Sequence, residues 1–264
     1  LESDEIPGAR LELQVHGRRY RATANAEGLF QARIKGPLRV GLHPVGARLV
    51  SDGRGRPRRF RVAGARLRVW PAGPGVAVLS DIDDTVLDTG VRSRVRMARR
   101  ALTTAAEDLE SFAFAPALFR VLGARNYPLV FVSGSPVNFY PKLRRFLRLK
   151  GFPEAALLLK DFGPRGLTRQ RAYKLGQIAV VLDLLPGYRF ILVGDDGEQD
   201  PEIYAEVRRR HKGRVAAVLI HMVSRRPGAA LAGQWYFRDF RDAARELRRR
   251  KLLTARDLRR VGVK

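Results

Sequence analysis

The arrangement of apolar and polar residues changes near residue 71. From Arg10 to Val69, apolar residues alternate with polar ones in short runs that are separated by turns rich in Gly and Pro. Examples are Leu11-Glu12-Leu13-Gln14-Val15, Phe30-Gln31-Ala32-Arg33-Ile34 and Arg66-Leu67-Arg68-Val69-Trp70. Such alternation is typical of strands that bury one face. We therefore predict that residues 1–75 form a small antiparallel, β-sandwich-like domain, which ends at the Pro- and Gly-rich segment 71–75.

After residue 75 the apolar residues form solid runs instead. Five runs, each too short for a helix, occupy residues 76–79, 129–132, 156–159, 190–193 and 215–220. Helical patterns lie between them at 141–149, 173–185 and 201–210. This alternation of strands and helices predicts a Rossmann-like α/β fold over residues 76–224, with a parallel sheet covered by helices on both faces.

The last part of the chain, residues 225–264, combines 13 basic and 4 acidic side chains with apolar residues at helical spacing, and it is predicted to be a basic amphipathic helical tail. The whole chain has 51 Lys and Arg against 26 Asp and Glu, a net charge of +25. This charge favours a partner that carries phosphates, either an anionic membrane surface or nucleic acid, although a coding bias toward Arg would also produce it. The absence of cysteine excludes disulfides and thiolate zinc sites.

Acids and hydroxyl groups directly follow three of the predicted strands. They are Asp81, Asp83 and Thr85 after the first strand, Ser133, Gly134 and Ser135 after the second, and Asp195 and Asp196 after the fourth, with Lys174 at the start of the helix 173–185. In a parallel sheet these strand ends meet at one edge, where ligands bind. Clustered carboxylates need a cation, and a site of oxygen ligands alone favours Mg²⁺ over zinc.

This set of side chains fits phosphoryl transfer. Asp81 can attack phosphorus to give an aspartyl phosphate, and Asp83, two residues further along extended backbone, points the same way and can move a proton. Ser133 and nearby main-chain amides can bind phosphoryl oxygens, while Lys174 neutralises their charge. The four histidines show no ligand spacing and are assigned no role.

The same residues resemble the four ordered motifs of the haloacid dehalogenase superfamily. Ser80-Asp81-Ile82-Asp83-Asp84-Thr85, Val132-Ser133-Gly134-Ser135-Pro136, Lys174-Leu175-Gly176-Gln177 and Gly194-Asp195-Asp196-Gly197-Glu198-Gln199-Asp200-Pro201 are similar to the catalytic domain of the actin-patch-associated phosphatidate phosphatases and their bacterial relatives. The resemblance covers about residues 76–224, and it implies Mg²⁺-dependent hydrolysis of a phosphomonoester. It also implies that Asp196 and Asp200 are supporting acids.

The candidate site follows from the residues and the resemblance together. The predicted catalytic residues are Asp81, Asp83, Thr85, Ser133 and Lys174, the substrate-binding residues are Ser133, Gly134, Ser135 and Lys174, and the metal ligands are Asp81, Asp83, Asp195 and Asp196.

The spacing of the motifs bears on the substrate. Only about 43 residues separate Thr85 from the second strand, too few for a large lid domain, so we expect an open site that acts on a phosphate carried by a large molecule. Our first hypothesis is hydrolysis of phosphatidate at a membrane surface to diacylglycerol and phosphate. The alternatives are a nucleic-acid end phosphatase and a non-enzymatic module that binds anionic membranes or nucleic acid. With no apolar run near 20 residues, we expect a cytoplasmic protein that associates peripherally with the membrane.

Overall fold

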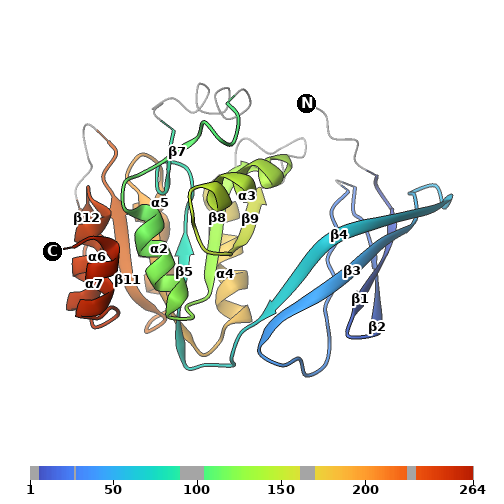
Figure 1. Cartoon of the computed structure of the whole chain (residues 1–264), viewed down its shortest axis with the longest axis horizontal. Coiled ribbons are helices and arrows are strands. Elements are labelled where there is room, and N and C mark those ends of the chain that lie inside the picture. Colours follow the sequence, from blue (N-terminus) through green and yellow to red (C-terminus); the bar gives the residue numbers. More distant parts are fainter. Residues whose placement is uncertain (1–5, 27, 90–103, 161–169, 225–229, 264) are drawn as a thin grey trace. The chain divides into compact units, whose positions relative to one another are not determined.

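The computed structural model describes residues 6–26, 28–89, 104–160, 170–224 and 230–263 (Figure 1). The chain divides into two compact units, Leu1–Pro71 and Ala72–Lys264. Each unit has its own sheet.

The first unit contains the predicted antiparallel sheet. Its strands are β1 (Arg10–Val15), β2 (Arg18–Thr23), β3 (Gly41–Ser51) and β4 (Pro57–Val69), and they lie in the order β2-β1-β3-β4. His16 and Gly17 join β1 to β2 with φ of 47° and 75°, the left-handed conformation that a tight hairpin turn requires. The alternating run 30–34 lies outside the described strands, because it connects β2 to β3 without pairing.

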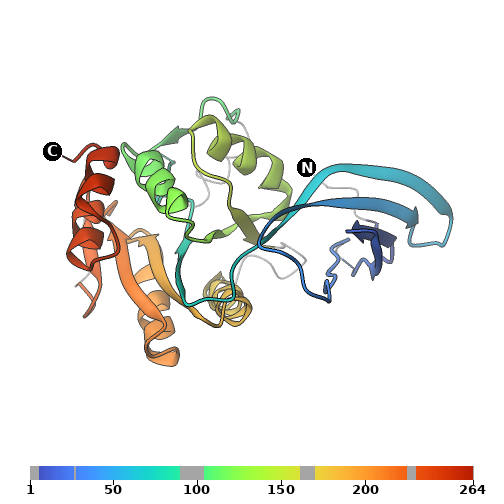
Figure 2. The same cartoon turned by 60° about the horizontal axis from the view of Figure 1, so that its bottom comes forward.

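The second unit is built on a six-stranded parallel sheet, as predicted (Figures 1 and 2). Its strands are β5 (Gly75–Ser80), β8 (Leu129–Pro136), β9 (Ala156–Lys160), β10 (Tyr188–Asp195), β11 (Val215–His221) and β12 (Trp235–Phe237), in the order β12-β11-β10-β5-β8-β9. Five of them contain the five apolar runs. β12 is a sixth strand that the sequence patterns do not predict. Two short strands, β6 (Leu87–Asp88) and β7 (Glu110–Ser111), pair separately near the end of β5.

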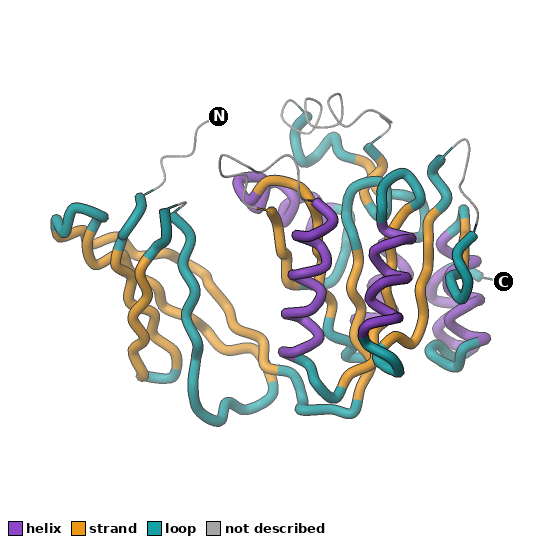
Figure 3. The backbone as a smooth tube through the Cα atoms, turned by 180° about the vertical axis from the view of Figure 1, so that it is seen from behind, coloured by secondary structure: helices purple, strands orange, loops and turns teal. Residues whose placement is uncertain are grey.

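Helices cover both faces of this sheet (Figures 1 and 3). One face carries α2 (Ala115–Ala124), α3 (Tyr140–Leu149), α6 (Phe240–Arg249) and α7 (Ala255–Val261), and the other carries α4 (Gln170–Leu184) and α5 (Asp200–Arg210). Alternate residues of each central strand enter the two cores. On β10, Ile191 and Val193 pack in the first core, while Phe190 and Leu192 pack in the second.

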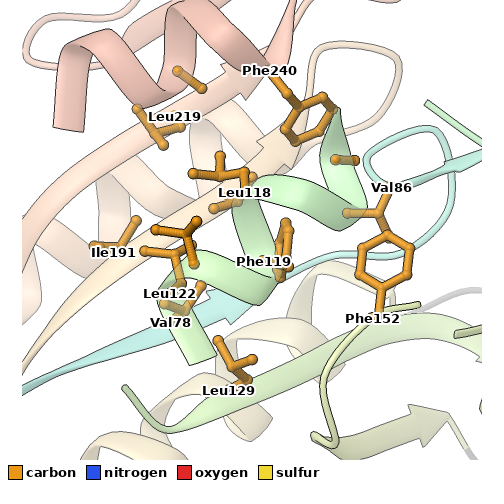
Figure 4. Close-up of a cluster of buried hydrophobic side chains, with 14 of the residues drawn as sticks. Val78, Val86, Leu118, Phe119, Leu122, Leu129, Phe152, Ile191, Leu219 and Phe240 are labelled. Atoms are coloured by element: carbon orange, nitrogen blue, oxygen red, sulfur yellow. The ribbon is translucent and has the colours of Figure 1, made fainter. Parts of the chain in front are cut away.

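The first core is rich in aromatic side chains (Figure 4). Phe119 of α2 stacks on Phe131 of β8 with ring centroids 5.5 Å apart, and Phe152 meets both rings edge to face. Leu118 and Phe119 are essentially inaccessible to solvent. This packing fixes α2 against the middle of the sheet and thereby holds the strands that carry the site.

The C-terminal segment is an integral part of the second unit, which differs from the separate tail predicted for residues 225–264. β12 extends the sheet beside β11, and α6 and α7 pack on one face. Phe240, Ala243, Ala244 and Leu247 are at most 1% exposed. The amphipathic pattern is therefore real, but its apolar face covers the sheet of this chain, so it is unavailable to a membrane or nucleic acid.

Candidate active site

The carboxyl ends of β5, β8 and β10 bring the predicted motifs together. Asp81 follows β5 directly, and its main-chain N–H donates to the carbonyl of Val193 in β10 at 2.9 Å. Asp195 is the last residue of β10, and Ser133 lies near the end of β8. All three of these polar side chains are buried, with Asp81 only 2% exposed. The strand-end rule thus places buried acids and a hydroxyl at one edge of the sheet.

Three buried carboxylates form the centre of the site. Asp81, Asp195 and Asp200 each offer one oxygen, and these atoms all lie within 4.8 Å of one another. Lys174, the fifth residue of α4, is the cation among them. Its Nζ lies 2.6 Å from Asp200, 3.1 Å from Asp81 and 3.8 Å from Glu198. One ammonium group therefore faces three carboxylates, and the fourth acid, Asp195, lies in the same cluster.

The pKa values reflect this excess of negative charge. Burial raises the pKa of Asp81 well above its usual value, and although Lys174 opposes the shift, the carboxylates of Asp200 and Asp195 add to it. Burial likewise raises the pKa of Asp195 well above its usual value, and Asp200 adds to the shift. Burial alone would lower the pKa of Lys174, but Asp200 and Asp81 raise it well above the ordinary range. Lys174 is thus held charged, and no second basic side chain in the described parts of the chain pairs with these acids.

The donor set fits a hard divalent cation. Asp200 Oδ2 is buried and has no hydrogen-bond partner among the described residues, and Asp81 Oδ1 is buried with only the ion-pair contact to Lys174 at 3.1 Å among them. All available donors are oxygens, which favours Mg²⁺. Gly194 allows the Asp200 carboxylate to approach the end of β10, because a Cβ at this position would stand 2.4 Å from Asp200 Oδ2. The residues present can therefore hold the ion that the sequence predicts, with Asp200 in the cluster.

Asp196, a predicted metal ligand, lies outside this cluster. Its Oδ1 accepts hydrogen bonds from the main-chain N–H groups of Val223 at 2.7 Å and Ser224 at 2.8 Å. Neighbouring residues at the end of a strand point to opposite sides, so Asp195 turns toward the acids and Asp196 toward the segment after β11. Oδ1 of Asp196 therefore anchors a loop, while its Oδ2 is buried without a hydrogen-bond partner among the described residues. Its role as a metal ligand stays a prediction, and Asp200 joins Asp81 and Asp195 in the cluster.

Asp83 is held beside the acidic cluster by the loop at the end of β8. Asp83 Oδ2 accepts hydrogen bonds from Ser133 Oγ at 2.9 Å and from Ser135 Oγ at 2.7 Å. The hydroxyl oxygen of Ser133 in turn accepts from the N–H of Ser135 at 2.9 Å. Both serines thus orient the predicted acid/base, a role beyond the phosphate contact expected of them. Gly134, between them, lies under the side chain of Gln170.

Thr85, the remaining predicted catalytic residue, is fully buried, and its Oγ1 donates to Asp195 Oδ2 at 3.3 Å. This hydrogen bond positions a cluster oxygen. In the described structure Thr85 therefore contacts an acid of the site and supports it.

Several residues at the site were given no role from the sequence. Glu198 contacts Lys174 and accepts a hydrogen bond from Gln170, which encloses the cluster on the side of α4. His221 is 3% exposed, and its Nδ1 lies 3.1 Å from the carbonyl of Asp84. Its ring packs against Phe112 and other aromatic rings, and burial lowers its pKa. Only its position at the end of a predicted strand could have indicated a place near the site.

Comparison with known proteins agrees with this arrangement. The family model of the catalytic domain of phosphatidate phosphatase APP1 matches residues 76–222, more than half of the chain. Phosphatidate phosphatase APP1 of Saccharomyces cerevisiae is 29% identical over 157 residues, 57% of this chain and 26% of that protein. The uncharacterized protein C29B5.04c of Schizosaccharomyces pombe is 29% identical over 153 residues, 56% of this chain and 25% of that protein. The chain thus spans about a quarter of the length of these two relatives.

Two solved structures have similar folds. A haloacid dehalogenase-like hydrolase from Burkholderia xenovorans LB400 superposes with a TM-score of 0.48 and 16% identity, covering 68% of this chain and 99% of that one. D,D-heptose 1.7-bisphosphate phosphatase from B. bronchiseptica, complexed with magnesium and phosphate, superposes with a TM-score of 0.48 and 14% identity. The match covers 67% of this chain and 99% of that one. The resemblance found in the motifs is confirmed by the family model, whose matched residues include the whole acidic cluster. The chain therefore belongs to the family of the phosphatidate phosphatase APP1 catalytic domain, a family of phosphatases.

Proposed function

We propose that this chain hydrolyses a phosphomonoester through an aspartyl phosphate, and that its substrate is phosphatidate in a membrane. The observation that carries the proposal is the buried cluster of Asp81, Asp195, Asp200 and Lys174, with Asp83 fixed beside it. A nucleophile, a proton carrier and an excess of negative charge that a cation would offset are the parts that phosphoryl transfer requires.

The residues divide the reaction into two steps. In the first, an oxygen of Asp81 forms a bond to phosphorus while the bond from phosphorus to the leaving oxygen breaks, and Asp83 donates a proton to that oxygen. In the second, water attacks phosphorus, Asp83 accepts a proton from the water, and the aspartyl bond breaks to release phosphate. Ser133 and Ser135 fix one oxygen of Asp83, which orients the other for both proton transfers.

Lys174 and the proposed cation would neutralise the negative charge of the carboxylates and of the phosphoryl group. Asp81 and Asp195, with Asp200 and the main-chain carbonyl of Asp83 beside them, would hold Mg²⁺. When bound, the ion would supply positive charge that draws electrons from the phosphoryl oxygens. Lys174, which Asp200 holds at 2.6 Å, adds a fixed charge close to the nucleophile.

Phosphatidate is favoured by the name of the matched family and by the properties of this chain. The relative from S. cerevisiae is named as a phosphatidate phosphatase. The net charge of +25 suits a surface of anionic lipids. Within the described part of the chain, no helix is both long and apolar enough to span a bilayer. We propose that the protein reaches the lipid by peripheral binding from the cytoplasmic side.

The test is release of inorganic phosphate with and without Mg²⁺. Phosphatidate in phosphatidylcholine vesicles, p-nitrophenyl phosphate and a 3′-phosphorylated oligonucleotide are compared as substrates. Asp81→Asn removes the nucleophile, and Asp183→Asn, an exposed position on α4, is the matched control. We expect Mg²⁺-dependent release from the vesicles that Asp81→Asn abolishes and Asp183→Asn retains.

Two results would overturn parts of the proposal. Turnover that survives in Asp81→Asn would exclude the aspartyl phosphate. Release from the oligonucleotide but not from the vesicles would exclude phosphatidate and favour a nucleic-acid end phosphatase.

A further inference from the structure

The outer surface of α3 is strongly basic. Leu143, Phe146 and Leu147 point into the first core, so the opposite side of the helix faces solvent. That side presents Arg144, Arg145 and Arg148, together with Tyr140 and Leu149, which are 39% and 48% exposed. From Tyr140 to Lys150 the sequence contains five basic residues and no acid. We call Tyr140, Arg144, Arg145, Arg148 and Leu149 the α3 face.

The α3 face adjoins the loop that orients Asp83. β8 carries Ser133 and Ser135 and ends at Pro136, and the short helix η1 (Val137–Phe139) leads directly into α3. Figures 1 and 3 show α3 at the end of the sheet where β8 and β9 finish. Because the site lies at these same carboxyl ends, the α3 face lies at the same edge of the sheet as the site.

Charge balance distinguishes α3 from α5 and α6, the two helices whose arginines are mostly paired. On α6, Arg241, Arg245 and Arg249 each form an ion pair with an acid at or near the same helix, at 2.5–2.7 Å. On α5, Glu206 pairs with both Arg209 and Arg210.

On α3 itself, Arg145 pairs with Glu107 and the following Lys150 with Glu110. Among the described residues, no acidic side chain lies within ion-pair distance of Arg144 or Arg148. The positive charge of α3 is thus less neutralised than that of α6, which makes the α3 face the better candidate for binding an external anion.

We propose that the α3 face docks on a bilayer that contains anionic lipids and so presents a lipid phosphate to the site; this inference deepens the proposed function and rests on it. Arg144 and Arg148 would meet the lipid phosphates. Tyr140 and Leu149, exposed at opposite ends of the helix, suit the boundary between headgroups and acyl chains, where aromatic and apolar side chains gain from burial. A nucleic acid would satisfy the arginines but leave Leu149 in water, so the lipid surface is favoured.

Binding to vesicles measures docking apart from catalysis. Phosphatidylcholine vesicles with and without phosphatidylglycerol, which is not a phosphomonoester, are sedimented with the full chain. Each basic residue near an anionic bilayer strengthens binding about fivefold, so the double variant Arg144→Ala/Arg148→Ala should bind about 25-fold more weakly. The matched control is Arg248→Ala/Arg256→Ala, which removes two exposed arginines from α6 and α7 and should bind like the native chain.

Turnover separates failure of docking from failure of the proposed function. For Arg144→Ala/Arg148→Ala, the ratio of activity on phosphatidate vesicles to activity on p-nitrophenyl phosphate should fall, while the control keeps the native ratio. Equal weakening in both double variants, or native vesicle binding by Arg144→Ala/Arg148→Ala, would overturn the docking surface. Loss of binding to a single-stranded oligonucleotide without loss of binding to vesicles would also overturn it, in favour of nucleic acid. Absence of turnover on every substrate would instead count against the proposed function and leave the binding result standing.

Discussion

Lys174→Met tests whether one buried ammonium group holds the acidic cluster together. The side chain of Lys174 is 2% exposed, and its Nζ lies 2.6 Å from Asp200 and 3.1 Å from Asp81. Methionine has a similar length and no charge, so the substitution removes the cation without leaving a large cavity. Removal of one partner of a buried ion pair costs about 3–5 kcal/mol, because the remaining charge is left buried without compensation. We expect a loss of this size in the free energy of unfolding at neutral pH in metal-free buffer.

The loss should depend on pH in a definite direction. Lys174 lowers the pKa of Asp81 and Asp195, so its removal raises both further above the ordinary value of 3.8. An acid whose pKa is raised by folding binds more protons in the folded state than in the unfolded state. Stability therefore falls as the pH rises through the folded pKa. The deficit of Lys174→Met should be largest above these raised pKa values, and it should shrink as the pH is lowered through them toward 4.

Native-state hydrogen exchange of the β5 and β10 amides is the suitable assay, because it reports the second unit separately from the first. Lys150→Met is the matched control: Lys150 pairs with Glu110 at 3.1 Å, but the Glu110 side chain is 73% exposed. A pair of this kind contributes at most about 1 kcal/mol. A deficit for Lys174→Met no larger than that of Lys150→Met, or one that grows as the pH falls, would refute the reasoning.

Three further substitutions test other parts of the structure. Asp196→Ala removes the acceptor of two main-chain N–H groups and should lower the free energy of unfolding in urea by about 1–3 kcal/mol. In calorimetric titration it should still bind Mg²⁺ as the native chain does, whereas Asp195→Ala should not; weakened binding in Asp196→Ala would identify it as a ligand. Ser135→Ala removes one of two hydroxyl donors to Asp83 and should lower kcat about 2- to 10-fold on p-nitrophenyl phosphate with KM unchanged, and an unchanged kcat would exclude a positioning role. Phe240→Ala should cost about 3–5 kcal/mol in thermal unfolding, and native stability would contradict the packing of α6 on the sheet.

The parallel sheet could be predicted because its strands are buried on both faces. Such strands appear as solid apolar runs, and five of the six strands contain one. β12 could not be found in this way, because its three residues, Trp235–Phe237, are too few to give a period. The run 30–34 shows the reverse case, an alternating pattern in a segment that finds no partner strand. The hydrophobic pattern indicates which segments can bury one face. Whether such a segment pairs as a strand depends on which segments the fold places beside it.

The sequence also does not determine which acids after β10 enter the cluster. The rule for strand ends is sufficient to bring Asp81 and Asp195 to one edge. It does not determine which of the later acids turns inward, because the chain leaves the sheet there and the turn sets each direction. Asp200 enters the cluster as the first residue of α5, while Asp196 turns to the loop after β11. The roles of these two acids therefore depend on the turn between β10 and α5, which no residue pattern specifies.

The net charge also does not show by itself which surface binds an anionic partner. The excess of +25 is spread over the chain, and the densest basic segment by sequence is the C-terminal one. In the structure α6 uses its apolar side to cover the sheet, and several of its arginines meet acids of their own helix. α3 has as many basic residues as α6 but no acid of its own, and it follows the loop that orients Asp83. A surface for an anionic partner is therefore identified by two features together. Its basic side chains have no acidic partners, and it lies beside the site. By this criterion α3, and not α6, is the helix whose arginines should control access to a phosphate in a membrane.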